Sequence, residues 1–143
     1  MTAPTAIAFT VLGPPVPYAR TRRSGGTGHA FIPRKQRDYR AHVAACLAVE
    51  MLNAQLHEPL RGALVMRLHI HCGSYVMGDA SNFAKIVEDV CQGPRGAFVD
   101  DVQIVDLIVH RYLDRERPRI RVYIEQLGAE HDVRVPKSKR RPA

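Results

Sequence analysis

Apolar and polar positions alternate in four stretches of the chain, and a period of two predicts β-strands with one buried face. The clearest stretch is 64–72, where Arg67, His69 and His71 alternate with apolar residues. A first strand is expected at 7–11 and another from 102 to about 112. A last strand starts at Pro118, and its inward-facing residues are Ile120, Val122 and Ile124.

Two other stretches have the longer period of an amphipathic helix. In the first, apolar residues recur every four positions from residue 35 to about residue 55, and they are Tyr39, Val43, Leu47 and Met51. The second helix is expected from about residue 81 to residue 91, where Gly93 and Pro94 stop it. Residues 13–34, rich in Pro, Gly and Arg, are expected to form a loop.

The resulting order, β-α-β-α-β-β, mixes hairpin and crossover connections. It predicts the α+β class, with one domain in which a small mixed β-sheet packs with two main helices. We expect this domain to cover residues 1–128. Residues 129–143 are polar and basic, and they predict a disordered tail.

The chain of 143 residues carries 21 Lys and Arg against 14 Asp and Glu, a formal net charge of +7. A surface of this charge attracts polyanions, and nucleic acid is the first candidate partner. The alternative is a basic protein that binds no nucleic acid. The basic residues of the predicted loop and of the following helix start suit contact with a phosphate backbone, or form a solvated surface. They are Arg20, Arg22, Arg23, Arg34, Lys35 and Arg37.

Other composition signals narrow the possibilities. Cys46, Cys72 and Cys91 form no CxxC pair, so the sequence indicates neither a zinc site nor a disulfide framework. His69 and His71 share a strand face, which suits a transition-metal site, but ordinary strand positions are the simpler interpretation. The sequence has no signal-peptide pattern and no stretch that would span a bilayer, so we expect a cytoplasmic protein without a membrane partner.

The candidate chemistry lies in a polar stripe on the second predicted helix and in two aspartates that follow it. The stripe consists of Asp79, Ser81, Asn82, Lys85 and Asp89, and the pair is Asp100 and Asp101. A Mg²⁺ ion held by Asp79 and Asp101 would polarise a phosphodiester, and Lys85 would neutralise phosphate charge. The alternatives are that Asp79 or Ser81 caps the helix, that the stripe is a solvated face, and that the pair forms a turn.

Three blocks of this sequence resemble the RusA family of Holliday junction resolvases, endonucleases common in phages and prophages. They are residues 13–17 with Arg20, Arg22 and 31–35, residues 79–85 with Asp89, and residues 98–104. The resemblance spans residues 9–125. It implies a homodimer that binds branched DNA, the four-way junction, and resolves it by paired nicks in DNA recombination and repair. It also implies Mg²⁺ as the cofactor, with Mn²⁺ as its substitute.

Carried over by position, the resemblance implies that Asp79, Asp100 and Asp101 are catalytic metal ligands and that Lys85 is the catalytic lysine. Ser81, Asn82 and Asp89 would support them. Ser81 stands where the family's motif has a second aspartate, so the site lacks one negative charge. We expect cleavage to be retained, with the missing charge as a reason for a lower rate. The alternative is a branched-DNA-binding module of the same fold with weak or lost cleavage.

Overall fold

The computed structural model describes residues 4–19, 22–23, 25–26, 28, 30–74 and 78–128. Along the chain the elements are β1 (Ala6–Leu12), β2 (Arg22–Arg23), β3 (Ala30–Phe31), α1 (Arg34–Asn53), β4 (Leu64–Cys72), α2 (Ala80–Cys91), a 3-10 turn η1 (Asp101–Gln103), β5 (Ile104–Leu113) and β6 (Arg119–Gln126). The predicted α+β class and the two helices are confirmed. The predicted tail, residues 129–143, lies outside the described residues.

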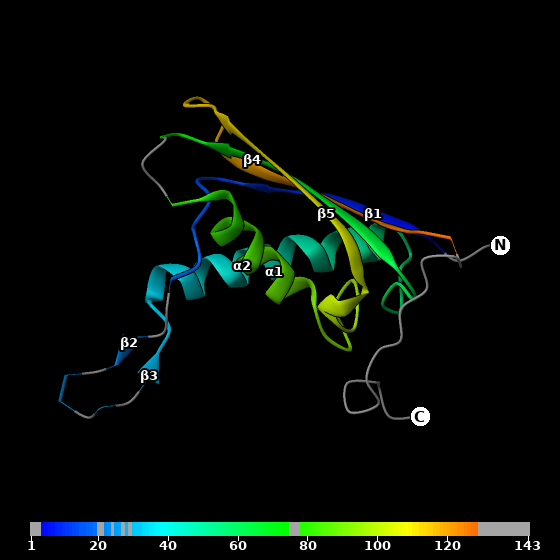
Figure 1. Cartoon of the computed structure of the whole chain (residues 1–143), viewed down its shortest axis with the longest axis horizontal. Coiled ribbons are helices and arrows are strands. Elements are labelled where there is room, and N and C mark those ends of the chain that lie inside the picture. The colour runs from blue at the N-terminus through cyan, green and yellow to red at the C-terminus, as the bar shows by residue number, and fades with distance from the viewer. Residues whose placement is uncertain are drawn as a thin grey trace.

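Four strands form one mixed sheet in the order β1-β6-β4-β5. β6 is antiparallel to both β1 and β4, whereas β4 and β5 are parallel and are connected through α2. Both helices lie on one side of this sheet (Figure 1). Within the described part of the chain, no helix is long and apolar enough to cross a membrane.

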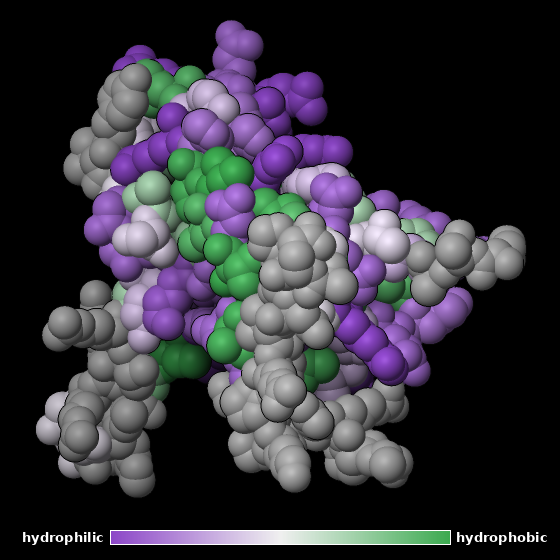
Figure 2. Space-filling view, turned by 45° about the vertical axis from the view of Figure 1, so that its right-hand side comes forward, coloured by the Kyte–Doolittle hydropathy of each residue, from purple (hydrophilic) through white to green (hydrophobic). Residues whose placement is uncertain are grey.

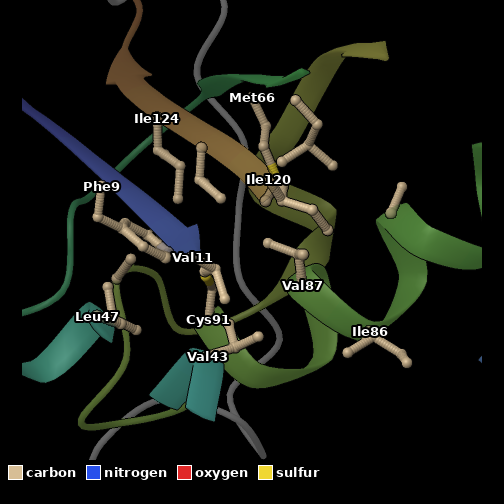
Figure 3. Packing of buried hydrophobic residues seen from close by; sticks show 14 of the residues in the cluster. Phe9, Val11, Val43, Leu47, Met66, Ile86, Val87, Cys91, Ile120 and Ile124 are labelled. Atoms are coloured by element: carbon tan, nitrogen blue, oxygen red, sulfur yellow. The ribbon is translucent and has the colours of Figure 1, made fainter. Parts of the chain in front are cut away.

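The core fills the space between the sheet and the two helices (Figure 3). The predicted inward-facing residues of β6, Ile120, Val122 and Ile124, are fully buried. Three of the four periodic residues of α1 are buried, and Met51 at its end is partly buried. The two periods read from the sequence therefore identify the core faces of α1 and β6 correctly.

The structure differs most from the predicted elements in the loop after β1 and at the start of β5. The loop expected at 13–34 contains the short β2–β3 hairpin. The strand expected from Val102 begins at Ile104, because η1 precedes it. The cause is a capping box, in which the Asp100 side chain accepts the Val102 N–H and Gln103 accepts the Asp100 N–H.

α2 begins one residue earlier than predicted, and Asp79 is its N-cap. Asp79 Oδ1 accepts the backbone N–H of Asn82 at 3.0 Å and the hydroxyl of Ser81 at 2.9 Å. The interpretation of Asp79 as a helix cap is therefore confirmed. Because a cap satisfies backbone donors that have no partner within the helix, this carboxylate has a structural role whatever else it does.

Two substitutions separate that structural role from the charge. Asp79→Ala removes the cap acceptor, and we expect it to lower the free energy of unfolding by about 1 kcal/mol. Asp79→Asn keeps an oxygen acceptor of equal capping strength, so its stability should stay within about 0.5 kcal/mol of the wild type. Urea unfolding followed by circular dichroism without added metal measures both. Equal losses in the two variants would contradict the assigned cap.

Candidate active site

The first turns of α2 pack against the segment that follows β1. The N–H of Tyr18 donates to the carbonyl of Asn82 at 2.9 Å, which holds Tyr18 beside the helix. The Lys85 ammonium lies 5.1 Å from the centre of the Tyr18 ring, and the Lys85 side chain is half exposed. A cation over an aromatic face is attracted by the ring. Contact with the Tyr18 ring thus positions Lys85 at the protein surface, about one turn after α2 begins.

Asp89 lies about one turn beyond Lys85 on α2, between two cations. The Arg40 guanidinium donates to Asp89 Oδ2 at 3.3 Å, and the Lys85 ammonium is 3.9 Å from the same oxygen. Because Arg40 belongs to α1, this carboxylate connects the two helices. Asp89 is close to Lys85, with which it was predicted to share a helix face, and about 15 Å of helix separates it from Asp79.

The Asp100–Asp101 pair follows the turn at the far end of α2. Asp100 is 2% exposed, and its side chain caps η1. The N–H of Asp101 donates to the Gln92 side chain at 2.9 Å, and Asp101 itself is exposed. Asp100 is therefore a buried carboxylate that caps η1, whereas Asp101 is a surface carboxylate whose backbone is held by Gln92.

Glu88 belongs to this acidic end of α2, and the sequence analysis missed it. Burial raises the pKa of its carboxyl, the neighbouring Asp101 and Asp89 carboxylates raise it further, and the Lys85 ammonium lowers it. Sequence spacing could have identified Glu88. It lies three residues after Lys85 and four before Gln92, which places the three side chains on one helix face. The predicted polar stripe runs through the adjacent positions Asn82, Lys85 and Asp89 instead.

The predicted ligands of one metal ion do not converge within one chain. Asp79 is at the N-terminus of α2, whereas Asp101 is beside Gln92 at its C-terminus. A helix of 12 residues is about 18 Å long, so one cation does not reach both carboxylates. Among the described residues, no three His, Cys, Asp or Glu side chains form a group that would hold a metal. The donor type suits a hard cation, but the arrangement within one chain does not.

The predicted DNA-contacting residues of α1 lie at the same end of the molecule as Asp79. Arg34, Lys35 and Arg37 are exposed on the first turn of this helix. Between them, the buried Gln36 accepts the N–H of Ala19 at 2.7 Å, so the residue after Tyr18 is attached to α1.

The other predicted contacts belong to the segment before this helix. Arg22 and Arg23 form β2, whereas Arg20 lies outside the described residues. In Figure 1 the hairpin and the first turns of both helices occupy the same side of the molecule. Arg34, Lys35 and Arg37 therefore lie on the side of the molecule where α2 begins.

Comparison with known proteins assigns the family. The model of the endodeoxyribonuclease RusA family matches residues 13–125, which include all of α1, α2, η1 and β5. A search of curated proteins finds no match for the chain. The matched range includes Asp79, Lys85 and Asp101 and covers most of the chain. The chain belongs to the RusA family of endodeoxyribonucleases, which act on Holliday junctions.

Proposed function

We propose that this protein resolves Holliday junctions by paired, Mg²⁺-dependent nicks during DNA recombination and repair, in the cytoplasm of a phage- or prophage-carrying cell. The observation that carries the proposal is the RusA match across residues 13–125. The exposed Asp101, on a backbone fixed by Gln92, and the half-exposed Lys85 support it. Both are surface groups of the kind that a bulky DNA substrate can reach.

Nucleases of this family generally depend on a divalent metal. Carboxylate oxygens are the ligands that Mg²⁺ prefers, and Mn²⁺ accepts the same donors. Asp79, Asp100 and Asp101 are the proposed ligands, with Asp101 foremost because its carboxylate is on the surface. When bound, the ion would polarise the phosphodiester and lower the pKa of bound water.

The remaining site residues bind and orient the DNA. The Lys85 ammonium, attracted to the Tyr18 ring and to Asp89, neutralises charge on the phosphate. Arg34, Lys35 and Arg37, together with the basic residues before them, hold the backbone without reading its sequence. Recognition of this kind depends on the shape of the junction rather than on base contacts.

Substitution of the surface aspartate tests the proposal. Asp101→Asn should reduce junction nicking in Mg²⁺ by about 100-fold or more, because it removes a charged oxygen ligand. Glu58→Gln, at an exposed acidic residue of the loop before β4, is the matched control and should nick at the wild-type rate. Nicks are counted on a labelled immobile four-way junction. Equal rates for the two variants would remove Asp101 from the site.

The second candidate function is a branched-DNA-binding module with weak or lost cleavage. It is favoured by Ser81, whose hydroxyl donates to Asp79 Oδ1 where the family's motif has a second carboxylate. A hydroxyl is a neutral and weaker ligand for Mg²⁺ than a carboxylate. Tight junction binding without nicking in Mg²⁺ or Mn²⁺ would identify this function.

The Ser81→Asp substitution measures how much the missing charge matters. It replaces a donor to Asp79 with a second carboxylate, and like charges at this distance raise the pKa of one of them. We expect lower stability without metal and a nicking rate at least ~10-fold higher at subsaturating Mg²⁺. Ser81→Asn, which adds no charge, is the control. A rate for Ser81→Asp at or below the wild-type rate would contradict this role.

We propose that the protein acts as a homodimer joined along β5. In the described residues β5 is an edge of the sheet, and an unpaired edge strand is a template for another strand. Its exposed hydrophobic residues, 36–46% accessible, are Val105, Leu107, Tyr112 and Leu113. Figure 2 shows hydrophobic residues gathered in a band on the side of the molecule it views. An apolar edge that stays exposed is a liability for a protein without a partner.

The sequence of β5 is complementary to itself. Antiparallel pairing about a two-fold axis through Ile108 would place Asp106 opposite the partner's His110 and Leu107 opposite the partner's Val109. Each pair then lies on one face of a continuous sheet. The first pair joins an acid with a base, and the second joins two apolar residues.

This pairing has a consequence for the active site. The Arg111 side chain donates to the Gly78 carbonyl, so the Asp79 end of α2 lies near the end of β5, whereas Asp101 comes just before β5 begins. An antiparallel β5 pair would therefore turn the Asp79 end of one protomer toward the partner's Asp101. Two such sites also suit paired nicks on opposed strands.

A cysteine on the proposed axis tests the dimer. With Cys46 replaced by Ser, Ile108→Cys should form an intermolecular disulfide under mild oxidation, because each residue 108 faces its own copy. Thr10→Cys, on the opposite edge strand β1, should remain uncrosslinked. Light scattering of the wild type should give twice the chain mass. A monomeric mass, or equal crosslinking of both variants, would contradict the β5 interface.

A further inference from the structure

The sheet face opposite the helices carries an ordered block of side chains that the proposed site does not use. The block spans the middle of β6, β4 and β5, where the pairing registers align three rows of three residues. The rows are Arg119, His71 and Tyr112, then Arg121, His69 and His110, then Tyr123, Arg67 and Ile108. We call these nine residues the open-face block. In the described part of the chain, no helix covers this face (Figure 1).

Aromatic rings in the block are stacked across the strands. The His69 and His110 rings are 5.4 Å apart and inclined by 10°, and those of His71 and Tyr112 are 4.7 Å apart and inclined by 17°. The Tyr112 hydroxyl and His69 Nδ1 are 3.0 Å apart. These separations are close to the spacing of neighbouring strands, so the rings stand side by side on the sheet. Ring stacking and the Tyr112–His69 contact therefore hold these side chains in a defined arrangement on the sheet.

Guanidinium groups flank this stack. The Arg67 guanidinium lies 5.8 Å from the centre of the Tyr123 ring, and Arg121 donates to the Thr10 hydroxyl at 2.9 Å. Both arginines are exposed. Arg119 is held by Asp114 at 2.9 Å. Each partner orients a cation that retains further N–H donors, because a guanidinium carries five.

Within one chain, acidic residues lie only at the ends of the block, and in the proposed dimer the partner's Asp106 lies beside its β5 edge, opposite His110. None of its nine residues is acidic, and the next row along the strands brings Asp106 and Glu125. Asp114 lies beyond the opposite end. The centre therefore presents positive charge and hydrogen-bond donors, with Ile108 as its one aliphatic side chain. That chemistry suits a polyanion, whereas a protein interface would have an apolar centre.

We propose that the open-face block binds the phosphate backbone of a DNA arm. The inference rests on the proposed function for its ligand, and the charge of the block is complementary to DNA. The block lies on the sheet face opposite α2, so it is separate from the Asp79 and Lys85 surface. A junction has several arms, and a second contact would hold an arm that leads away from the cleavage point. Contacts to phosphates position such an arm without sequence preference.

A pair of double variants tests the proposal. Arg67→Gln with Arg121→Gln removes two charges from the block. Arg61→Gln with Arg95→Gln removes two exposed charges elsewhere. Affinity for a four-way junction is measured in EDTA between about 50 and 200 mM salt, so that no cleavage is needed. The block pair should reduce the slope of log affinity against log salt by about 2 and weaken binding ~10-fold near 100 mM. The control pair should change the affinity less than ~2-fold.

A charge-conserving variant excludes a merely structural effect. Arg67→Lys with Arg121→Lys should retain most of the salt slope, because each lysine still neutralises a phosphate. Equal slopes for the block and control pairs would overturn the proposal. A change of oligomeric mass in the block pair with an unchanged slope would also overturn it, by making this face a protein interface. The block pair can reduce the salt slope while the wild type fails to nick the junction. That result would contradict the proposed nuclease function and leave the proposed DNA-binding surface supported.

Discussion

The candidate active site depends on one buried amide, that of Gln103. Its Oε1 accepts the N–H groups of Val99 and Asp100 at 3.0 and 3.1 Å, and its Nε2 donates to the carbonyls of Leu60 and Gly62 at 3.1 and 3.0 Å. A carboxylate has no donor and an ammonium has no acceptor, so a neutral amide suits all four partners. Each buried backbone group left without a partner costs about 1–3 kcal/mol. The turn that presents Asp100 and Asp101 is therefore fixed to the loop before β4 through this side chain.

At the other end of α2, Asp79 likewise combines a proposed catalytic role with a structural one. Asp79 caps the helix, and Ser81 and Asn82 both donate to its Oδ1. A metal ion at this position would share a carboxylate oxygen that already accepts two hydrogen bonds. Because α2 separates Asp79 from Asp101, the proposed function requires either two protomers or a change in the position of α2. The β5 edge offers the first route without altering the fold.

The sequence was a good guide wherever a single period governs burial. α1 and β4 end within two residues of their predicted bounds, since each has one face against the core. β5 was predicted less well because it is an edge strand with a bulge between its pairings to Leu64 and Val65, so its exposure pattern does not alternate. η1 depends on the capping box of Asp100 and Gln103, which hydrophobic periodicity does not reveal.

For the candidate site, the sequence predicted which residues to consider but not the distances between them. Asp79 and Asp101 are both recognisable from the sequence motifs. Whether their carboxylates lie close together depends on the direction and length of α2 between them. Glu88 was not predicted because its raised pKa comes from burial and from the approach of Asp101, which follows the turn at 93–96. Long-range approaches of this kind require the tertiary structure.

The most direct test of the account compares two substrates under single-turnover conditions in Mg²⁺, an immobile four-way junction and a linear duplex of the same sequence. A dimeric junction resolvase should produce symmetric, paired nicks in the junction and no comparable cleavage of the duplex. Equal cleavage of both substrates, or nicks in one strand of the junction alone, would contradict a dimeric junction resolvase.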